Sequence, residues 1–407
     1  MNFTTRLVTH EMIGGAAMGL FLAVLGVFFL QKGLDVWQIG LVFGTMALSA
    51  ALFELPFGAA ADIYGRIRVW QMSRLAYLVA IPVMIFSDSF WLLMLAATLS
   101  GLSQALETGS IDAWVVERLK EDGEEENLQS FLSIFQSAMA TGIALGAVAG
   151  GYIPGLMPAL GVIEATEWNF VFIGALLLLQ LLLSPLLFHE GETVHIENKN
   201  RAVSGQITNA LRYGFEHGTL RALLVLGLFL GLVMASIEAY WQPRLVAITG
   251  EPIYEAFGWI TAGYFAMAIV GPMLIGVIAK ITGAGTRLQL MAVPILLGIV
   301  LILFSRQENF VPFVSIYLVV MLVSSMISPP ANTLLNKETP DEIRSTMQSI
   351  FSFIVMIGGT ISSFGFAPVV HSLGIAQTWG ILATIFLIAA IALTLLPGLR
   401  DPNDGRG

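Results

Sequence analysis

Four acidic residues lie inside or close to long apolar stretches of this chain, where an isolated charge is unfavourable. They are Glu54, Glu107, Asp112 and Glu238. A charged side chain at the centre of a bilayer costs about 2.5–3.5 kcal/mol even on insertion scales, so such residues are usually functional. A carboxyl group removed from water also retains a proton more readily and can exchange it near neutral pH. These residue types therefore point to proton exchange or ligand binding.

Glu107 is the strongest of these candidates because it belongs to a polar stripe. It follows Ser100 and Ser103 and precedes Ser110 at steps of three and four residues, which places all four on one helical face. Such a stripe faces either a partner helix or a water-filled cavity. The serines alone favour packing, whereas Glu107 shifts the interpretation towards a cavity. A protonated, hydrogen-bonded structural role for Glu107 stays open.

Two of the other acidic residues lie nearer the ends of their helices. Glu54 is expected to pair with Arg74 or a backbone amide, which favours a structural role. Asp112 is rotated about 140° around the helix from Glu107, so the two carboxylates do not share a face. A contact at the helix end is the simpler interpretation for Asp112, although both residues remain candidates for coupling or substrate binding.

The fourth acidic residue, Glu238, lies beside two aromatic residues near the end of an apolar run. An aromatic belt at the membrane interface would explain Tyr240 and Trp241. Glu238 has no such explanation, so it is a candidate for the transport path, together with its aromatic neighbours. Gln104 and Gln136 are two further polar candidates within apolar runs.

The composition defines the class of protein in which these residues act. Of 407 residues, 56% are hydrophobic and only 12% are charged, against about 25% charged in soluble domains. Several apolar runs reach the roughly 20 residues that cross a bilayer as a helix. The chain is therefore predicted to be an all-α, polytopic membrane protein embedded in the lipid bilayer.

Twelve membrane-spanning helices are predicted, six on each side of a polar segment. The spans lie near 12–30, 38–60, 70–87, 91–113, 129–152, 168–188, 220–242, 258–279, 288–304, 312–333, 346–369 and 377–397. Residues 189–219 form the polar linker, in which 206–217 has helical spacing. The predicted domains are an N-terminal bundle, 1–188, the linker, 189–219, and a C-terminal bundle, 220–407.

The basic residues predict the direction of these helices. With both termini and the linker in the cytoplasm, 16 of the 19 Lys and Arg residues fall on the cytoplasmic side. Only Lys32, Arg244 and Arg306 fall on the other side. This is the bias of the positive-inside rule, and we expect a multi-pass protein of a plasma membrane, most simply a bacterial inner membrane.

An internal repeat relates the two halves. GAAADIYG, 58–65, follows the second span, and GVIAKITG, 276–283, follows the eighth at an offset of 218 residues. A duplicated transporter would show such an echo at equivalent loops. We therefore expect two pseudo-symmetric six-helix bundles, with a chance similarity of Gly-containing turns as the alternative.

The loop after the second span resembles the signature loop of the major facilitator superfamily. Its matching residues are Gly58, Asp62, Gly65, Arg66 and Arg68. Ile63 and Ile67 depart from the basic residues of that signature. The stretches ELPFG, 54–58, GSIDAW, 109–114, and EIRSTMQSI, 342–350, resemble a branch of exporters in the same family. The resemblance implies that the loop controls switching between inward- and outward-facing states.

A glycine series in the fifth span resembles the antiporter motif of drug exporters. The series is Gly142, Gly146, Gly150 and Gly151. Ala147 stands where the motif has proline, which weakens the likeness. Glycines every four residues also allow close helix packing without any role in coupling, and that interpretation is at least as good.

Several activities are disfavoured by what the sequence lacks. There is no cysteine and no GxxxxGKS/T loop, so neither thiolate chemistry nor nucleotide-driven transport is expected. His189 and His195 are six residues apart and do not form a metalloprotease motif, so we expect no metal and no cofactor. No stretch is basic enough for nucleic acid. The five His fall at span ends or in loops, and no Lys or Arg is expected mid-helix.

These observations favour a secondary transporter that acts as a monomer on a small-molecule substrate, and not an enzyme. Proton-coupled efflux of a small amphipathic or cationic molecule is the leading hypothesis. A proton-coupled importer of a sugar or another metabolite is the alternative. An integral membrane enzyme or a lipid-moving protein is a more distant one.

Overall fold

The computed structural model describes residues 3–107, 110–121, 128–157, 159–160, 163–188 and 200–396. In these ranges the secondary structure is helical, apart from connecting turns and one isolated bridge between Leu160 and Ile163. Twelve helical spans of this part are long and apolar enough to cross a membrane. The predicted all-α fold with twelve membrane-spanning helices is therefore confirmed.

The chain divides into two compact units. Unit 1 comprises residues 1–197 and 251–265, and unit 2 comprises 198–250 and 266–407. Helix α10, Tyr254–Thr282, begins in unit 1 and ends in unit 2. The domain boundaries expected at 188 and 220 stay a prediction.

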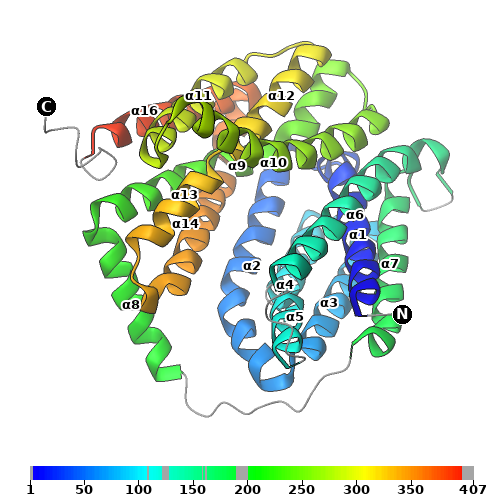
Figure 1. Ribbon diagram of the computed structural model, residues 1–407. Coiled ribbons are helices and arrows are strands. Elements are labelled where there is room, and N and C mark those ends of the chain that lie inside the picture. The colour runs from blue at the N-terminus through cyan, green and yellow to red at the C-terminus, as the bar shows by residue number, and fades with distance from the viewer. Residues whose placement is uncertain are drawn as a thin grey trace, which may run out of the picture. The chain divides into compact units, whose positions relative to one another are not determined.

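Unit 1 contains seven further helices (Figure 1). They are α1 (Phe3–Gln31), α2 (Val36–Tyr64), α3 (Arg66–Phe86), α4 (Phe90–Glu107), α5 (Ser110–Glu121), α6 (Leu128–Leu156) and α7 (Glu167–Leu187). Its main core gathers Phe28 and Phe29 of α1, Phe170 of α7 and apolar residues of α2, α3 and α4. The first span, Thr4–Gln31, starts well before the predicted position, which brings the polar residues before Met12 into the helix.

Unit 2 is built mainly from the linker helix and the helices that follow it. They are α8 (Asn200–Glu216), α9 (Gly218–Thr249), α11 (Thr286–Ser305), α12 (Phe310–Ser325), α13 (Ser328–Glu338), the short 3₁₀ turn η2 (Asp341–Ile343), α14 (Arg344–Gly365), α15 (Ala367–Leu373) and α16 (Ile375–Thr394). Pro329 and Pro368, at the second positions of α13 and α15, fit the first helical turn, where no intrahelical N–H bond is lost.

The closest helix pair in each unit depends on glycine. In unit 1, α1 packs along α6, and a methyl group on Gly19 or Gly146 would overlap the facing backbone. In unit 2, α9 packs along α14, and Gly231 and Gly358 have the same restriction. Without a hydrophobic driving force between helices in lipid, such close approach supplies much of the packing energy. Figure 1 shows α1 beside α6 and α9 near α14.

The internal repeat predicted from the loop sequences also appears in the helix boundaries. Helices α2 and α10 are both 29 residues long, and each boundary of α10 lies 218 residues beyond its counterpart in α2. Each helix is followed by a glycine with positive φ, Gly65 at 95° and Gly283 at 69°. Residues with a Cβ avoid this backbone region, so glycine is needed to end each helix there.

The predicted linker helix is present as α8, which contacts α9 and α14 in unit 2. Glu338 at the end of α13 joins it to the bundle. Its carboxylate lies 2.8 Å from the Arg287 guanidinium and 3.7 Å from Nε2 of His217. The Tyr213 hydroxyl donates to the Glu338 carbonyl over 3.4 Å. One acidic residue therefore links the end of α8 to α11 and α13.

Candidate functional site

Glu107, the acidic residue of the polar stripe, forms an ion pair with Arg74. The two terminal guanidinium nitrogens of Arg74 each donate to one carboxylate oxygen of Glu107, and the distance from Nη1 to Oε2 is 2.9 Å. Arg74 is buried, whereas 44% of the Glu107 side chain is exposed. The guanidinium also lies 4.9 Å from the ring centroid of Trp70, so cation–π attraction adds to the pairing. The pair joins α3 to the end of α4.

A second polar pair lies beside it on α1. Nδ1 of His10 is 2.8 Å from Oε1 of Glu11. Only 2% of His10 and 11% of the Glu11 side chain are exposed, and Nε2 of His10 has no hydrogen-bond partner in the described part of the chain. Arg74 and Glu107 are within electrostatic range of both residues. We call His10, Glu11, Arg74 and Glu107 the charge cluster.

Aromatic packing holds the charge cluster in place. The His10 ring centroid lies 4.8 Å from those of Trp70 and Phe188. Trp114 of α5 packs edge-on against Phe188 at 5.0 Å. The Gln180 amide of α7 donates to the His10 carbonyl over 2.9 Å. Trp70 of α3, Gln180 of α7 and Phe188 thus contact His10 directly, and α5 supports Phe188, so the His10 side chain is buried.

The charges in this cluster do not cancel when His10 is neutral. Arg74 and Glu107 offset one another, and Glu11 then leaves one negative charge. A buried charge without a counter-ion is costly. One added proton or one cationic ligand group would neutralise an ionised Glu11.

A hydroxyl-lined groove lies next to this cluster in unit 1. Its volume is about 410 Å³, and it runs between α1 and α6. Four hydroxyl-bearing and four apolar residues line it: Ser130, Ser133, Ser137, Thr141, Val8, Met12, Ile134 and Ala138. Alternating hydrogen-bonding and apolar walls suit a small amphipathic molecule.

Within the charge cluster, Glu11 is the residue of α1 that lies nearest to the groove-lining face of this helix. At 100° per residue, Glu11 is rotated about 60° from Val8 of the groove and about 100° from His10. It therefore lies between the groove-lining face of α1 and the buried face that carries His10. Glu11 is therefore the member of the charge cluster next to the groove-lining face of α1.

The serine stripe that pointed to a cavity is packed instead. Ser100, Ser103 and Ser110 are all buried, and the hydroxyls of Ser100 and Ser110 donate to carbonyls one turn earlier. A methyl group on Gly101 of the same helix would overlap α2 at Met46 and Ser49. Burial of Ser100 and Ser103 and the close packing of α4 on α2 agree with the packing role that the serines alone favoured, and not with the cavity that Glu107 suggested.

The other polar candidates of unit 1 differ in their exposure. Arg74 binds Glu107, so the pairing expected between Glu54 and Arg74 was wrong. Glu54 is half-buried on α2, and Gln104 and Gln136 are exposed on α4 and α6. Gln136 falls between Ser133 and Ser137 in the sequence of the groove-lining helix. The Asp112 side chain lies outside the described residues.

In unit 2, the candidates in the second half of α9 differ in exposure. Glu238 is exposed, whereas Tyr240 and Trp241 are only 2% and 6% exposed. Trp241 stacks on Tyr317 of α12 with ring centroids 5.2 Å apart. Burial of both aromatic rings overturns the aromatic-belt interpretation, because a belt residue must reach the membrane interface.

The glycine series of the fifth span faces α1 and the start of α10. Gly142 and Gly146 lie against Met12 and Ala16 of α1, Gly150 lies against Leu20, and Gly151 approaches Gly258. These contacts account for the glycines by packing. In the loop after α2, Arg66 is half-buried and Arg68 exposed. The surroundings of Gly58 and Asp62 lie outside the described part.

Sequence reasoning missed three members of the charge cluster. His10 and Glu11 precede the predicted start of the first span, and Arg74 was assigned to the cytoplasmic side, yet all three lie within candidate spans. The expectations that every His lies at a span end or loop and that no Arg lies mid-helix were wrong. An early helix start was readable from TRLVTHEMIGG, which contains no helix breaker before Gly14.

No metal site stands out in the described ranges. No group of three or more His, Asp or Glu residues there is placed to hold a metal ion. The other buried ion pair of note, between Lys32 and Glu167 at 2.5 Å, is joined by Asp88 at 3.2 Å. Its charges are satisfied locally, which suits a structural role at the opposite end of α1.

Twelve apolar helices, an internal repeat and a buried charge cluster beside a small groove define a polytopic transport protein. Comparison with known proteins agrees. A profile of the Major Facilitator Superfamily matches residues 11–363. The chain is 25% identical over 402 residues to the uncharacterized MFS-type transporter YxaM of Bacillus subtilis (strain 168), covering 96% of this chain and 94% of that one.

Solved structures share the fold at low sequence identity. The nucleoside transporter NupG superposes with a TM-score of 0.81 at 15% identity, covering 97% of this chain and 99% of that one. A bacterial homologue of the human lysosomal transporter Spinster, in an inward-facing, unoccupied conformation, gives 0.75 at 15% identity, covering 96% and 95%. A POT family peptide transporter gives 0.74 at 11% identity, covering 97% and 96%.

The chain belongs to the major facilitator superfamily. It is a multi-pass membrane protein and a secondary transporter, and it is not an enzyme.

Proposed function

We propose that this transporter exports a small amphipathic, cationic molecule in exchange for a proton. The observation that carries the proposal is the position of Glu11 between the hydroxyl-lined groove and the buried partners His10, Arg74 and Glu107. One negative charge in this cluster accommodates one proton or one ligand cation. Two occupants that neutralise the same charge compete, and competition of this kind is the basis of exchange.

The roles within the cluster follow from the contacts. Glu11 and His10 take up the proton, because the Nδ1–Oε1 contact of 2.8 Å lets them share it. Arg74 and Glu107 form a fixed ion pair that sets the local field. Glu107 is thus the partner of Arg74 and not the proton carrier, which revises the hypothesis drawn from the sequence.

The groove supports an amphipathic substrate. Its hydroxyl groups provide hydrogen-bond donors and acceptors, and its Val, Met, Ile and Ala side chains provide apolar contact. Gln136 on the same helix, and Glu238, Gln104 and Glu54 elsewhere, remain proposed contacts along the path. The loop at Gly65, Arg66 and Arg68 remains the proposed conformational switch.

We also propose that the protein is a monomer in a bacterial inner membrane, with both termini in the cytoplasm. The asymmetry of Lys and Arg between alternate loops supports this orientation. In it, the His10 end of α1 lies towards the cytoplasm, where an exported molecule enters.

A Glu11→Gln variant tests the proton site. Glutamine matches the shape of protonated Glu11 but cannot release a proton. The protein is assayed in inverted vesicles with an imposed proton gradient, using ethidium and related cationic dyes as probes. We expect gradient-driven accumulation to be lost, while downhill dye movement persists.

Glu308→Gln is the matched control, because Glu308 is an exposed carboxylate of unit 2. It should accumulate dye like the wild type. Full gradient-driven accumulation by Glu11→Gln would show that Glu11 is not the proton carrier.

A proton-coupled importer of a polar metabolite is the second candidate, and the four groove hydroxyls favour it. A neutral substrate does not compete with the proton for the charge of Glu11, so the two could bind together. Proton release into weakly buffered solution distinguishes the two. A cationic substrate should release about one proton on binding to the purified transporter, whereas a neutral co-transported substrate should cause proton uptake.

A further inference from the structure

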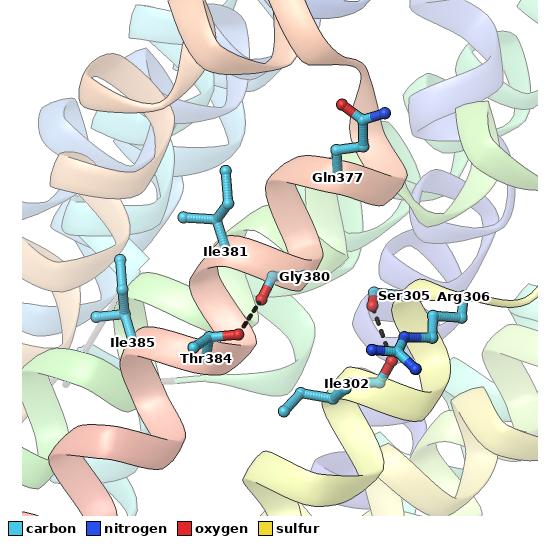
Figure 2. A pocket seen from close by; sticks show the side chains of 8 residues that line it. All are labelled: Ile302, Ser305, Arg306, Gln377, Gly380, Ile381, Thr384 and Ile385. Carbon is cyan, nitrogen blue, oxygen red and sulfur yellow. Dashed lines mark hydrogen bonds between the residues drawn. The ribbon is translucent and has the colours of Figure 1, made fainter.

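A second groove lies in unit 2, between the end of α11 and the start of α16 (Figure 2). Its volume is about 490 Å³, and it is open along one side. Ile302, Ser305 and Arg306 line it from α11, and Gln377, Gly380, Ile381, Thr384 and Ile385 line it from α16. The function proposed above makes no use of it.

Two polar side chains at one end of this groove are available to a ligand. Arg306 and Gln377 are both exposed. Within the described part of the chain, neither side chain has a hydrogen bond or ion pair to another residue. By contrast, the hydroxyls of Ser305 and Thr384 already donate to the carbonyls of Ile302 and Gly380 (Figure 2).

The polar end of the groove lies where the membrane-spanning segments end, and its apolar end lies deeper in these segments. The candidate spans end at Ser305 on α11 and begin at Ile375 on α16, so Arg306 and Gln377 lie at the edge of the hydrocarbon. Ile302 and Ile381 lie one helical turn deeper, and Ile385 lies two turns deeper, about 12 Å along the axis. The groove thus has two hydrogen-bond donors, Arg306 and Gln377, at its polar end, and isoleucine side chains line the rest of it.

The surrounding surface shows what covers this groove. Leu303, Ile299, Ile388 and Ile391 on the same two helices are exposed apolar side chains. Within a membrane-spanning segment such a surface contacts lipid tails. A molecule in the groove therefore has its apolar part in the bilayer and its polar part at the boundary.

We propose that this groove binds one anionic phospholipid. Its phosphate group is bound by the Arg306 guanidinium and the Gln377 amide, and an acyl chain lies along Ile302, Ile381 and Ile385. Arginine suits this role because its planar fork of donors pairs with two phosphate oxygens. A net-anionic lipid is favoured over a zwitterionic one, because only the former leaves a charge for Arg306 to neutralise.

Thermal unfolding of the purified full-length transporter in detergent tests the proposal. Phosphatidylglycerol should raise Tm in a saturable manner, and phosphatidylcholine should have a much smaller effect, since a ligand that binds only the folded state stabilises it. Arg306→Gln should weaken the apparent affinity for phosphatidylglycerol about tenfold or more, because charged hydrogen bonds are lost. Arg306 is exposed, so its Tm without lipid should match the wild type.

Two further variants separate this site from general attraction. Gly380→Leu should abolish the lipid response by filling the groove, since the nearest atom to an added Cβ is the Ser305 hydroxyl at 3.5 Å. Lys280→Gln, at an exposed cation by the other end of α11, should leave the response unchanged. An equal response to phosphatidylcholine, an unchanged affinity in Arg306→Gln, or an equal loss in Lys280→Gln would overturn the proposal. A Tm rise with inorganic phosphate alone would likewise contradict a lipid site.

Discussion

Removing the carboxylate of Glu107 should destabilise the protein by isolating a buried cation. In Glu107→Gln, Arg74 loses both charged hydrogen bonds and stays in a site where only 7% of its side chain is exposed. Breaking a buried pair from one side costs about 3–5 kcal/mol. Because 44% of the Glu107 side chain is exposed, water can replace part of the interaction, so we expect about 2–3 kcal/mol.

The same reasoning predicts that a second substitution restores stability. Arg74→Met removes the cation and keeps an unbranched side chain against Trp70. Alone, it leaves Glu107 unpaired but partly hydrated, and we expect a loss of about 1–2 kcal/mol. The double variant contains neither charge, so it should come within about 1 kcal/mol of the wild type. The two substitutions are therefore predicted to be strongly non-additive.

Thermal unfolding in detergent, followed by tryptophan fluorescence, measures this cycle. For a unit of this size, 1 kcal/mol corresponds to about 2–4 °C in Tm, so Glu107→Gln should lower Tm by roughly 5–10 °C. The double variant should recover most of that loss. Additive effects of the two single substitutions, or a Glu107→Gln variant as stable as the wild type, would refute the energetic role of the pair.

Two further predictions concern packing and the linker helix. Gly19→Ala should destabilise the protein by about 1–3 kcal/mol, because its methyl group overlaps the backbone of α6. Gly276→Ala is the control, because no atom lies within contact distance of an added methyl group there. In the same thermal unfolding assay, its Tm should equal or exceed that of the wild type. Glu338→Gln should speed hydrogen exchange of α8 amides, because it removes the carboxylate that contacts His217 directly after α8 and is held by Arg287 of α11. Glu216→Gln breaks only an exposed pair and should not have this effect. Equal exchange in both variants would contradict a tethering role for Glu338.

The positions of the helices were predictable because their cause is local. About 20 apolar residues in a row cross a bilayer wherever they occur in a chain. Hence 258–279 and 346–369 anticipate Tyr254–Thr282 and Arg344–Gly365 closely. The duplicated loop likewise predicted a repeat that recurs in the lengths of α2 and α10.

Glycine and serine patterns were harder to interpret from the sequence. A small residue on a helix face serves close packing or lines a cavity, and its neighbours on other helices decide which. Ser100 and Ser103 pack, as does Gly146, whereas Ser130 and Ser137 line a groove. The spacing along the helix is similar in both sets, so the sequence could not separate them.

The sequence by itself determined that this chain has twelve membrane-spanning helices in a repeated arrangement, because hydrophobic length and loop motifs act over a few turns. Tertiary structure alone decided which charges meet. Glu107 pairs with Arg74, 33 residues earlier. This pair lies beside His10 and Glu11 because α1, α3 and α5 pack around Trp70 and Phe188. Charge pairing depends on how separate helices approach one another, and the packing of side chains from distant segments sets that approach.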